Sequence, residues 1–173
     1  MKRLLGMAFA AGTLLTAACS SDNSIVPGSC SLTLSGAVTG TASCQIAAAT
    51  TASTGGKVSF GLEGQSGGTT FTFAAVLNET TFQTGTYGSS TGTSVVQAGG
   101  SASTSAGASW LQFNNTNGVN DQGSFVLTIT STGGSVPSGG YTGWPDPGGS
   151  LSVTLTAVPA SGASGTVTGQ ANF

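Results

Sequence analysis

The catalytic chemistry open to this chain is narrow because the sequence contains no histidine. Without an imidazole, Ser-His-Asp and Cys-His arrangements cannot form in their usual composition, and typical zinc sites lose one of their main ligand types. A glycosidase needs two carboxylates that face each other across a cleft. No motif brings together any two of the four carboxylates beyond residue 30, which are Glu63, Glu79, Asp121 and Asp146. We therefore predict a protein that is not an enzyme and carries no cofactor.

One polar loop has the residue types of a calcium site. Residues 114–123 read Asn-Asn-Thr-Asn-Gly-Val-Asn-Asp-Gln-Gly, and the candidate ligands are Asn117, Asn120 and Asp121. Calcium takes about six to eight oxygen ligands, and a good site has several carboxylates among them. This loop has a single carboxylate. We therefore interpret it as a turn-rich connection, for which Asn and Gly are suited by their left-handed backbone conformations.

A second segment has the residue types of a ligand-binding loop. Residues 141–149 read Tyr-Thr-Gly-Trp-Pro-Asp-Pro-Gly-Gly, a composition that argues against a regular strand. Exposed Tyr141 and Trp144, with Asp146 beside them, would suit contact with a sugar ring or a partner protein. Large aromatic side chains are, however, mostly buried. Our preferred interpretation is that Trp144 folds back and caps one end of the domain.

Apolar and polar residues alternate through most of the chain, which is the pattern of strands with one buried face. Clusters of glycine with Gly, Ser, Asn or Pro separate these segments. The alternation predicts strands over residues 57–63, 69–77, 82–87, 93–98, 108–113, 124–130, 151–158 and 166–173. Within 108–113 we expect Leu111 and Phe113 to face the core, and Trp110 to face the opposite side.

No segment beyond the N-terminal region combines a helical period with helix-forming residues, so we expect an all-β fold. Short strands joined by Gly-rich turns are typical of an antiparallel sandwich or barrel. Of the two we predict an antiparallel β-sandwich of about 8–10 short strands, in a Greek-key or jelly-roll-like order.

The first twenty residues have the layout of an export signal. A basic pair at residues 2–3 precedes an apolar run over residues 4–15, which is shorter than the roughly 20 residues of a membrane-spanning helix. The run ends in Leu15-Thr-Ala-Ala-Cys19, which resembles the lipobox of bacterial lipoproteins, with Thr16 where Leu is usual. The resemblance implies cleavage before Cys19, lipidation of Cys19 with palmitate-like acyl chains, and attachment to the outer membrane. An ordinary cleaved signal peptide is the alternative.

These features divide the chain into three parts: a cleaved signal peptide over 1–18, a lipidated cysteine and tether over 19–29, and one domain over 30–173. Cleavage removes both residues of the basic pair and leaves Lys57 against five carboxylates, a net charge of −4. Nucleic-acid binding depends on clustered Lys and Arg, so we expect no nucleic-acid partner. The membrane contact is expected through the lipid alone, because anionic lipid attracts basic segments.

Lipidation of Cys19 leaves Cys30 and Cys44 as a pair in a compartment that permits disulfides. If the chain turns at residues 36–38, the two cysteines lie opposite each other on the same face of a hairpin. If residues 30–44 instead form one long strand, the cysteines lie about 46 Å apart and no bridge can form. We favour the hairpin and the disulfide.

The sequence thus predicts a lipid-anchored protein of the cell envelope with a structural or accessory role. Beyond the signal, the composition resembles that of small Gly/Ser/Thr-rich envelope lipoproteins, which implies no functional residues. The alternative is a binding module that contacts a polysaccharide or an envelope protein through Tyr141 and Trp144.

Overall fold

The computed structural model describes residues 30–50, 54–88, 95–115, 121–138, 141–144 and 146–173. The described residues form antiparallel strands and a short 3-10 turn, η2 (Pro159–Ser161). The strands are β1 (Ser31–Gly36), β2 (Gly40–Thr50), β3 (Val58–Ser66), β4 (Thr69–Leu77), β5 (Gly85–Gly88), β6 (Val95–Thr104), β7 (Ser109–Asn115), β8 (Ser124–Ser131), β9 (Val136–Ser138), β10 (Tyr141–Trp144), β11 (Gly148–Ala157) and β12 (Thr166–Asn172). The expected all-β fold is confirmed.

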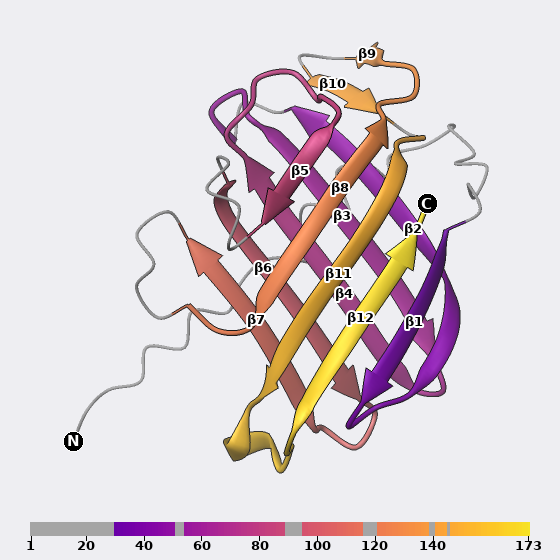
Figure 1. Ribbon diagram of the computed structural model, residues 1–173, viewed down its shortest axis with the longest axis vertical. Helices are drawn as coiled ribbons and strands as arrows, with labels where there is room; N and C mark the ends of the chain where they lie inside the picture. The colour runs from indigo at the N-terminus through magenta and orange to yellow at the C-terminus, as the bar shows by residue number, and fades with distance from the viewer. Residues whose placement is uncertain (1–29, 51–53, 89–94, 116–120, 139–140, 145) are drawn as a thin grey trace.

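The sheet closes on itself as an eight-stranded antiparallel barrel. Its order is β1-β12-β11-β7-β6-β4-β3-β2, and β1 also pairs with β2, which completes the ring. The predicted sandwich is therefore wrong, and so is its Greek-key or jelly-roll-like order, because most neighbours in the ring are also neighbours in sequence. The barrel is flattened, with β1, β12, β11, β8 and β5 in one wall and β2, β3, β4, β6 and β7 in the other (Figure 1).

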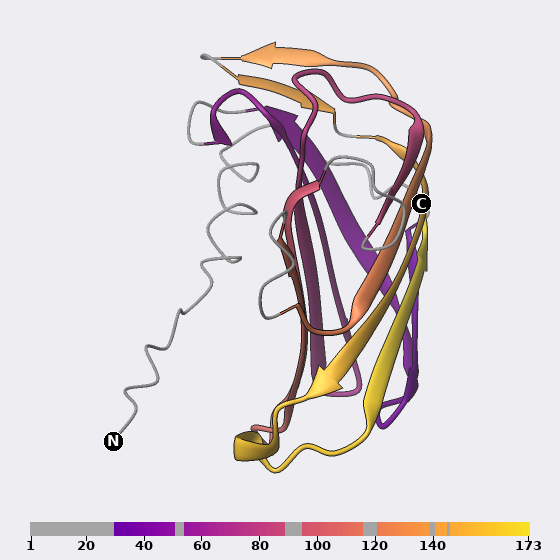
Figure 2. The same cartoon turned by 60° about the vertical axis from the view of Figure 1, so that its left-hand side comes forward.

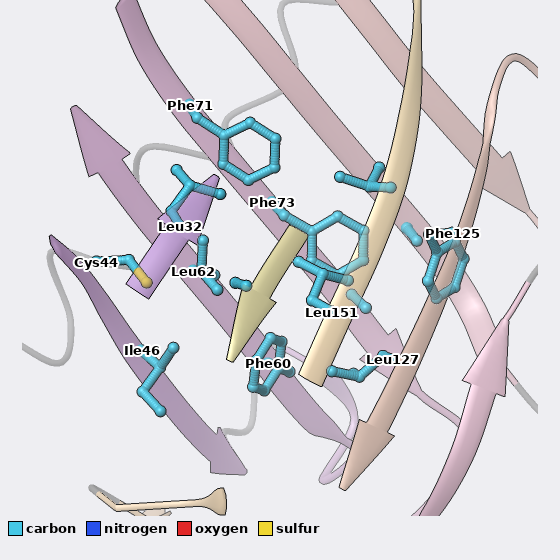
Figure 3. Close-up of a cluster of buried hydrophobic side chains, with 14 of the residues drawn as sticks. Leu32, Cys44, Ile46, Phe60, Leu62, Phe71, Phe73, Phe125, Leu127 and Leu151 are labelled. Atoms are coloured by element: carbon cyan, nitrogen blue, oxygen red, sulfur yellow. The ribbon is translucent and has the colours of Figure 1, made fainter. Parts of the chain in front are cut away.

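The barrel interior is an apolar core, as the period-2 alternation dictates. Along β4 every second residue is buried, and the buried positions include Phe71, Phe73 and Leu77. Phe73 lies 5.2 Å from the ring of Phe125 on the other wall and 6.5 Å from the ring of Phe60 (Figure 3). Besides Phe125, the buried hydrophobic side chains of β8, β11 and β12 are those of Leu, Val, Ile and Ala.

Glycines facing inward give the large rings their space. A Cβ placed on Gly169 would come within 2.6 Å of the Phe71 ring, and one on Gly64 would come within 2.8 Å of the Leu32 side chain. Both distances are shorter than any ordinary carbon contact. The high glycine content of the sequence therefore contributes to core packing as well as to turns.

Gly169→Ala is expected to lower the free energy of unfolding by about 1–3 kcal/mol, because Phe71 is fully buried and cannot move away from the added methyl group. Urea unfolding followed by tryptophan fluorescence measures the loss. Gly134→Ala is the control, since nothing lies within 4 Å of its added Cβ. Equal stability of the two variants would show that the Phe71 ring shifts without cost.

The core face of β7 is opposite to the predicted one. Trp110 is buried, whereas Leu111 is 40% exposed. The partner strand explains the inversion, because Ala102, Gly100 and Ala98 of β6 lie opposite Trp110, Gln112 and Asn114 of β7. These small inward residues leave room for the large side chains of β7. The interpretation of Trp110 as an outward residue was therefore wrong.

The barrel wall divides where β11 changes partners. Its last residues, Thr156 and Ala157, pair with β7, whereas Gly148–Thr154 pair with β8. β5 extends this branch by pairing with β8. Gly123 turns the chain at the division with a φ of +66°, and a Cβ there would come within 2.1 Å of the Thr154 carbonyl oxygen. Only glycine fits both the conformation and the space.

The eight predicted strand ranges all overlap observed strands, and 69–77 matches β4 throughout. The segment 141–149 was predicted as a loop, but its first four residues form β10, which pairs with β2 and β9. Figure 2 shows β9 and β10 lying across one end of the barrel. The prolines of the segment follow β10 and do not interrupt it.

The predicted hairpin and disulfide are confirmed. Ser31 pairs with Ser43 and Leu34 with Gly40, so the register centres on residue 37. Cys30 and Cys44 meet one position beyond the Ser31–Ser43 pair and form a disulfide with a Cα–Cα distance of 5.0 Å. The backbone N–H of Cys44 also donates to the carbonyl oxygen of Cys30 at 3.1 Å. The bond therefore joins the residue just before β1 to a residue within β2.

Candidate functional site

The aromatic residue of the predicted ligand loop belongs to the core. Trp144 is only 6% exposed, and its ring lies 5.7 Å from that of Phe82. Its backbone pairs with Ala48 of β2. Tyr141 begins β10, but its side chain lies outside the described part, and Asp146 is exposed. Trp144 and Phe82 thus close the end of the barrel that β9 and β10 cross.

Of the remaining predicted site residues, the structure describes only some. Cys19, Asn117 and Asn120 lie outside the described residues. Asp121 is exposed, just before β8. Among the residues with described positions, no group of three or more His, Cys, Asp or Glu could hold a metal ion.

A pair of buried polar side chains was missed by sequence reasoning. Gln112 is 2% exposed, and its Nε2 donates a hydrogen bond to Oδ1 of Asn114, which is also buried. In the described part of the chain, Gln112 Oε1 has no hydrogen-bond partner. The pair lies where the barrel wall divides, next to Gly100 and Gly123. Gln112 and Asn114 lie two and four residues after Trp110, so they share its face of the strand. This signal can be used only once Trp110 is known to face inward.

The amide pair yields a test by double substitution. Asn114→Leu alone is expected to cost about 1–3 kcal/mol of stability, because the buried Gln112 Nε2 then loses its acceptor. Replacing both residues, as Gln112→Met with Asn114→Leu, should recover most of that loss, since no buried amide then remains. Chemical unfolding of the two single variants and the double variant gives the coupling energy. Additive losses would show that the two amides do not interact.

The phenol group of Tyr87, a buried residue, has a pKa that differs clearly from its usual value. Burial raises the pKa of Tyr87 above its usual value of 10.0, and the charge of Glu79 raises it further. The hydroxyl group donates to the carbonyl oxygen of Gln83 at 3.3 Å. Because the folded state holds this proton more tightly than the unfolded state, Tyr87 lowers stability only as the pH rises above about 10. It has no titration near neutral pH that could serve catalysis.

The outer face of the wall formed by β1, β12, β11, β8 and β5, together with the adjoining part of β2, is rich in hydroxyl groups. Three successive rungs cross this wall, and we call their residues the hydroxyl rungs. They are Ser43, Ser31, Asn172, Ser150, Thr128 and Thr86; then Thr41, Thr33, Gln170, Ser152 and Val126; then Ser35, Thr168, Thr154 and Ser124. Twelve of these fifteen residues are Ser or Thr, none is charged, and none is buried. Neighbouring hydroxyls are thus spaced by about 4.8 Å across strands and about 6.7 Å along them.

Comparison with known proteins gives no assignment. No protein-family model matches the chain. No curated protein and no solved structure matches it either. Among the described residues, no helix is long and apolar enough to cross a membrane.

Proposed function

We propose that this chain is a lipid-anchored, non-catalytic protein of the bacterial cell envelope, with a structural or accessory role. The observation that carries the proposal is the burial of Trp144 in the core. Trp144, which only the alternative interpretation assigned to a ligand, packs on Phe82 at the end of the barrel and belongs to its apolar core. A barrel filled by its own side chains serves as a scaffold for its outer surface.

The anchor is supported by the N-terminal sequence and by the disulfide. Leu15-Thr-Ala-Ala-Cys19 resembles a lipobox, and two or three acyl chains are enough for stable membrane attachment. The Cys30–Cys44 bond fits an oxidising compartment, where exported proteins reside. Ser20 follows the cysteine, which in lipoproteins of Gram-negative type accompanies the outer membrane.

Metabolic labelling with palmitate tests the anchor. The full chain, expressed in a Gram-negative host, is expected to incorporate the label and to partition into detergent, whereas Cys19→Ala should do neither. Ser21→Ala is the matched control and should behave as the unchanged chain does. Equal labelling of all three, or no labelling of the unchanged chain, would overturn the lipid anchor.

The hydroxyl rungs favour a second candidate, the binding of a neutral polysaccharide. An uncharged surface of donors and acceptors suits an uncharged, hydroxyl-rich polymer. In a pull-down of the full chain on insoluble neutral polysaccharides, Thr33→Lys with Ser152→Lys should abolish retention. Thr70→Lys, on the opposite wall, is the control. No retention of the unchanged chain would eliminate this candidate.

A further inference from the structure

The disulfide lies beside β1, the strand that links β12 to β2 in the barrel ring. β1 pairs with β12 over six residues and with β2 over four, and among the described strands no other lies between β2 and β12 on this side of the ring. If β1 left the sheet, the barrel would open along both neighbours. The chain that enters β1 is also the segment that carries Cys19.

Tension on the N-terminal segment would load β1 first if the bond were absent. The chain enters β1 at Ser31, whose rung also contains Asn172 and Ser43. A pull at this end would strain the first rung alone, then the next, because each rung is held by its own few backbone hydrogen bonds. Hydrogen bonds broken one at a time offer little resistance, since each contributes only modestly to stability.

With the bond present, the load has a shorter covalent path. Cys30 and Cys44 are 14 residues apart in sequence, but their Cα atoms are only 5.0 Å apart. The backbone between them is about 46 Å long when extended, so it stays slack while the disulfide is taut. The load passes from Cys30 directly to Cys44 within β2, which pairs with β1, β3 and β10.

We infer that the Cys30–Cys44 disulfide is a mechanical clamp, which diverts tension on the N-terminal tether away from the barrel-closing strand β1. This inference rests on the proposed lipid anchor, which supplies the tension. Both cysteines are buried, so the clamp is permanent and does not act as a redox switch.

Single-molecule force measurement tests the clamp on the unlipidated mature chain, residues 19–173. The thiol of Cys19, the one cysteine outside the disulfide, takes one handle. An azide-bearing residue at the exposed Ala160 in η2 takes the other. In Cys30→Ala with Cys44→Ala, an early extension of about 30 Å, the length of β1 and its turn, should precede the main rupture. The oxidised chain should lack it and rupture first at a higher force.

A second pulling geometry separates a clamp from a general stabiliser. With handles at Gly134 and Ala160, tension does not pass through β1, so loss of the bond should change the first rupture force much less than in the N-terminal geometry. An equal change in both geometries would overturn the clamp.

A second variant keeps the inference testable if the double alanine variant does not fold. Thr33→Gly weakens the β1 ladder from an exposed position and leaves the bond intact. A clamp predicts an equal effect of this variant in both geometries. A larger effect under N-terminal tension would show that the load still passes through β1. Absence of palmitate at Cys19 would refute the anchor and leave these force results unaffected.

Discussion

Phe73→Ala is expected to lower the free energy of unfolding by about 3–5 kcal/mol, the largest loss from any single side chain considered in this protein. The Phe73 ring contacts Phe60 on the neighbouring strand and Phe125 on the opposite wall. Its removal leaves a cavity between the two walls. Gly100, whose Cβ position lies 3.4 Å from the Phe73 ring, has no side chain that could move in to fill the space.

Urea unfolding, monitored by the fluorescence of Trp110 and Trp144, measures this loss. Thr72→Ala is the matched control, because Thr72 is the adjacent residue, faces outward and hydrogen-bonds Ser101 at 2.8 Å. Its expected cost is about 1 kcal/mol or less. Phe73→Leu should fall between the two. A loss below about 1 kcal/mol for Phe73→Ala would mean that the flattened barrel collapses onto the vacated space.

Reduction of the Cys30–Cys44 bond is expected to cost about 3 kcal/mol of stability, because the bond joins residues 14 positions apart and so limits the conformations of the unfolded chain. Comparison of the oxidised and the reduced chain keeps every side chain the same, so no packing change from substitution enters the difference. Unfolding in urea with and without a phosphine reductant gives the value. A difference near zero would indicate that the unfolded chain retains the β1–β2 hairpin after reduction.

Local sequence patterns predicted the strands well and the ring poorly, for a physical reason. Thr69–Leu77 alternates without a break, and its residues were assigned to the correct face. Closure depends instead on pairs such as Leu32 with Ala171, which are remote in sequence. Alternation is the same in a sandwich and in a barrel with an apolar interior. What distinguishes the barrel is the pairing of β1 with β12 as well as with β2, which closes the sheet into a ring.

The buried amides of β7 were hidden for a related reason. The sequence Ser109-Trp-Leu-Gln-Phe-Asn-Asn115 has apolar residues in both phases of the alternation, and the local pattern favours the phase of Leu111 and Phe113, which is the wrong one. The small residues opposite, Ala98, Gly100 and Ala102, decide the phase, and their pairing with β7 is known only from the register. The β1–β2 hairpin, in contrast, was predictable because its cysteines and its turn lie within 15 residues.

The hydroxyl rungs have a consequence for how this protein responds to salt. Mobile ions screen interactions between charges, with a screening length of about 10 Å at 0.1 M and about 3 Å at 1 M ionic strength. A wall whose fifteen outward residues carry no charge has almost nothing to screen. Contacts made through this wall should therefore keep nearly the same strength from dilute buffer to concentrated salt.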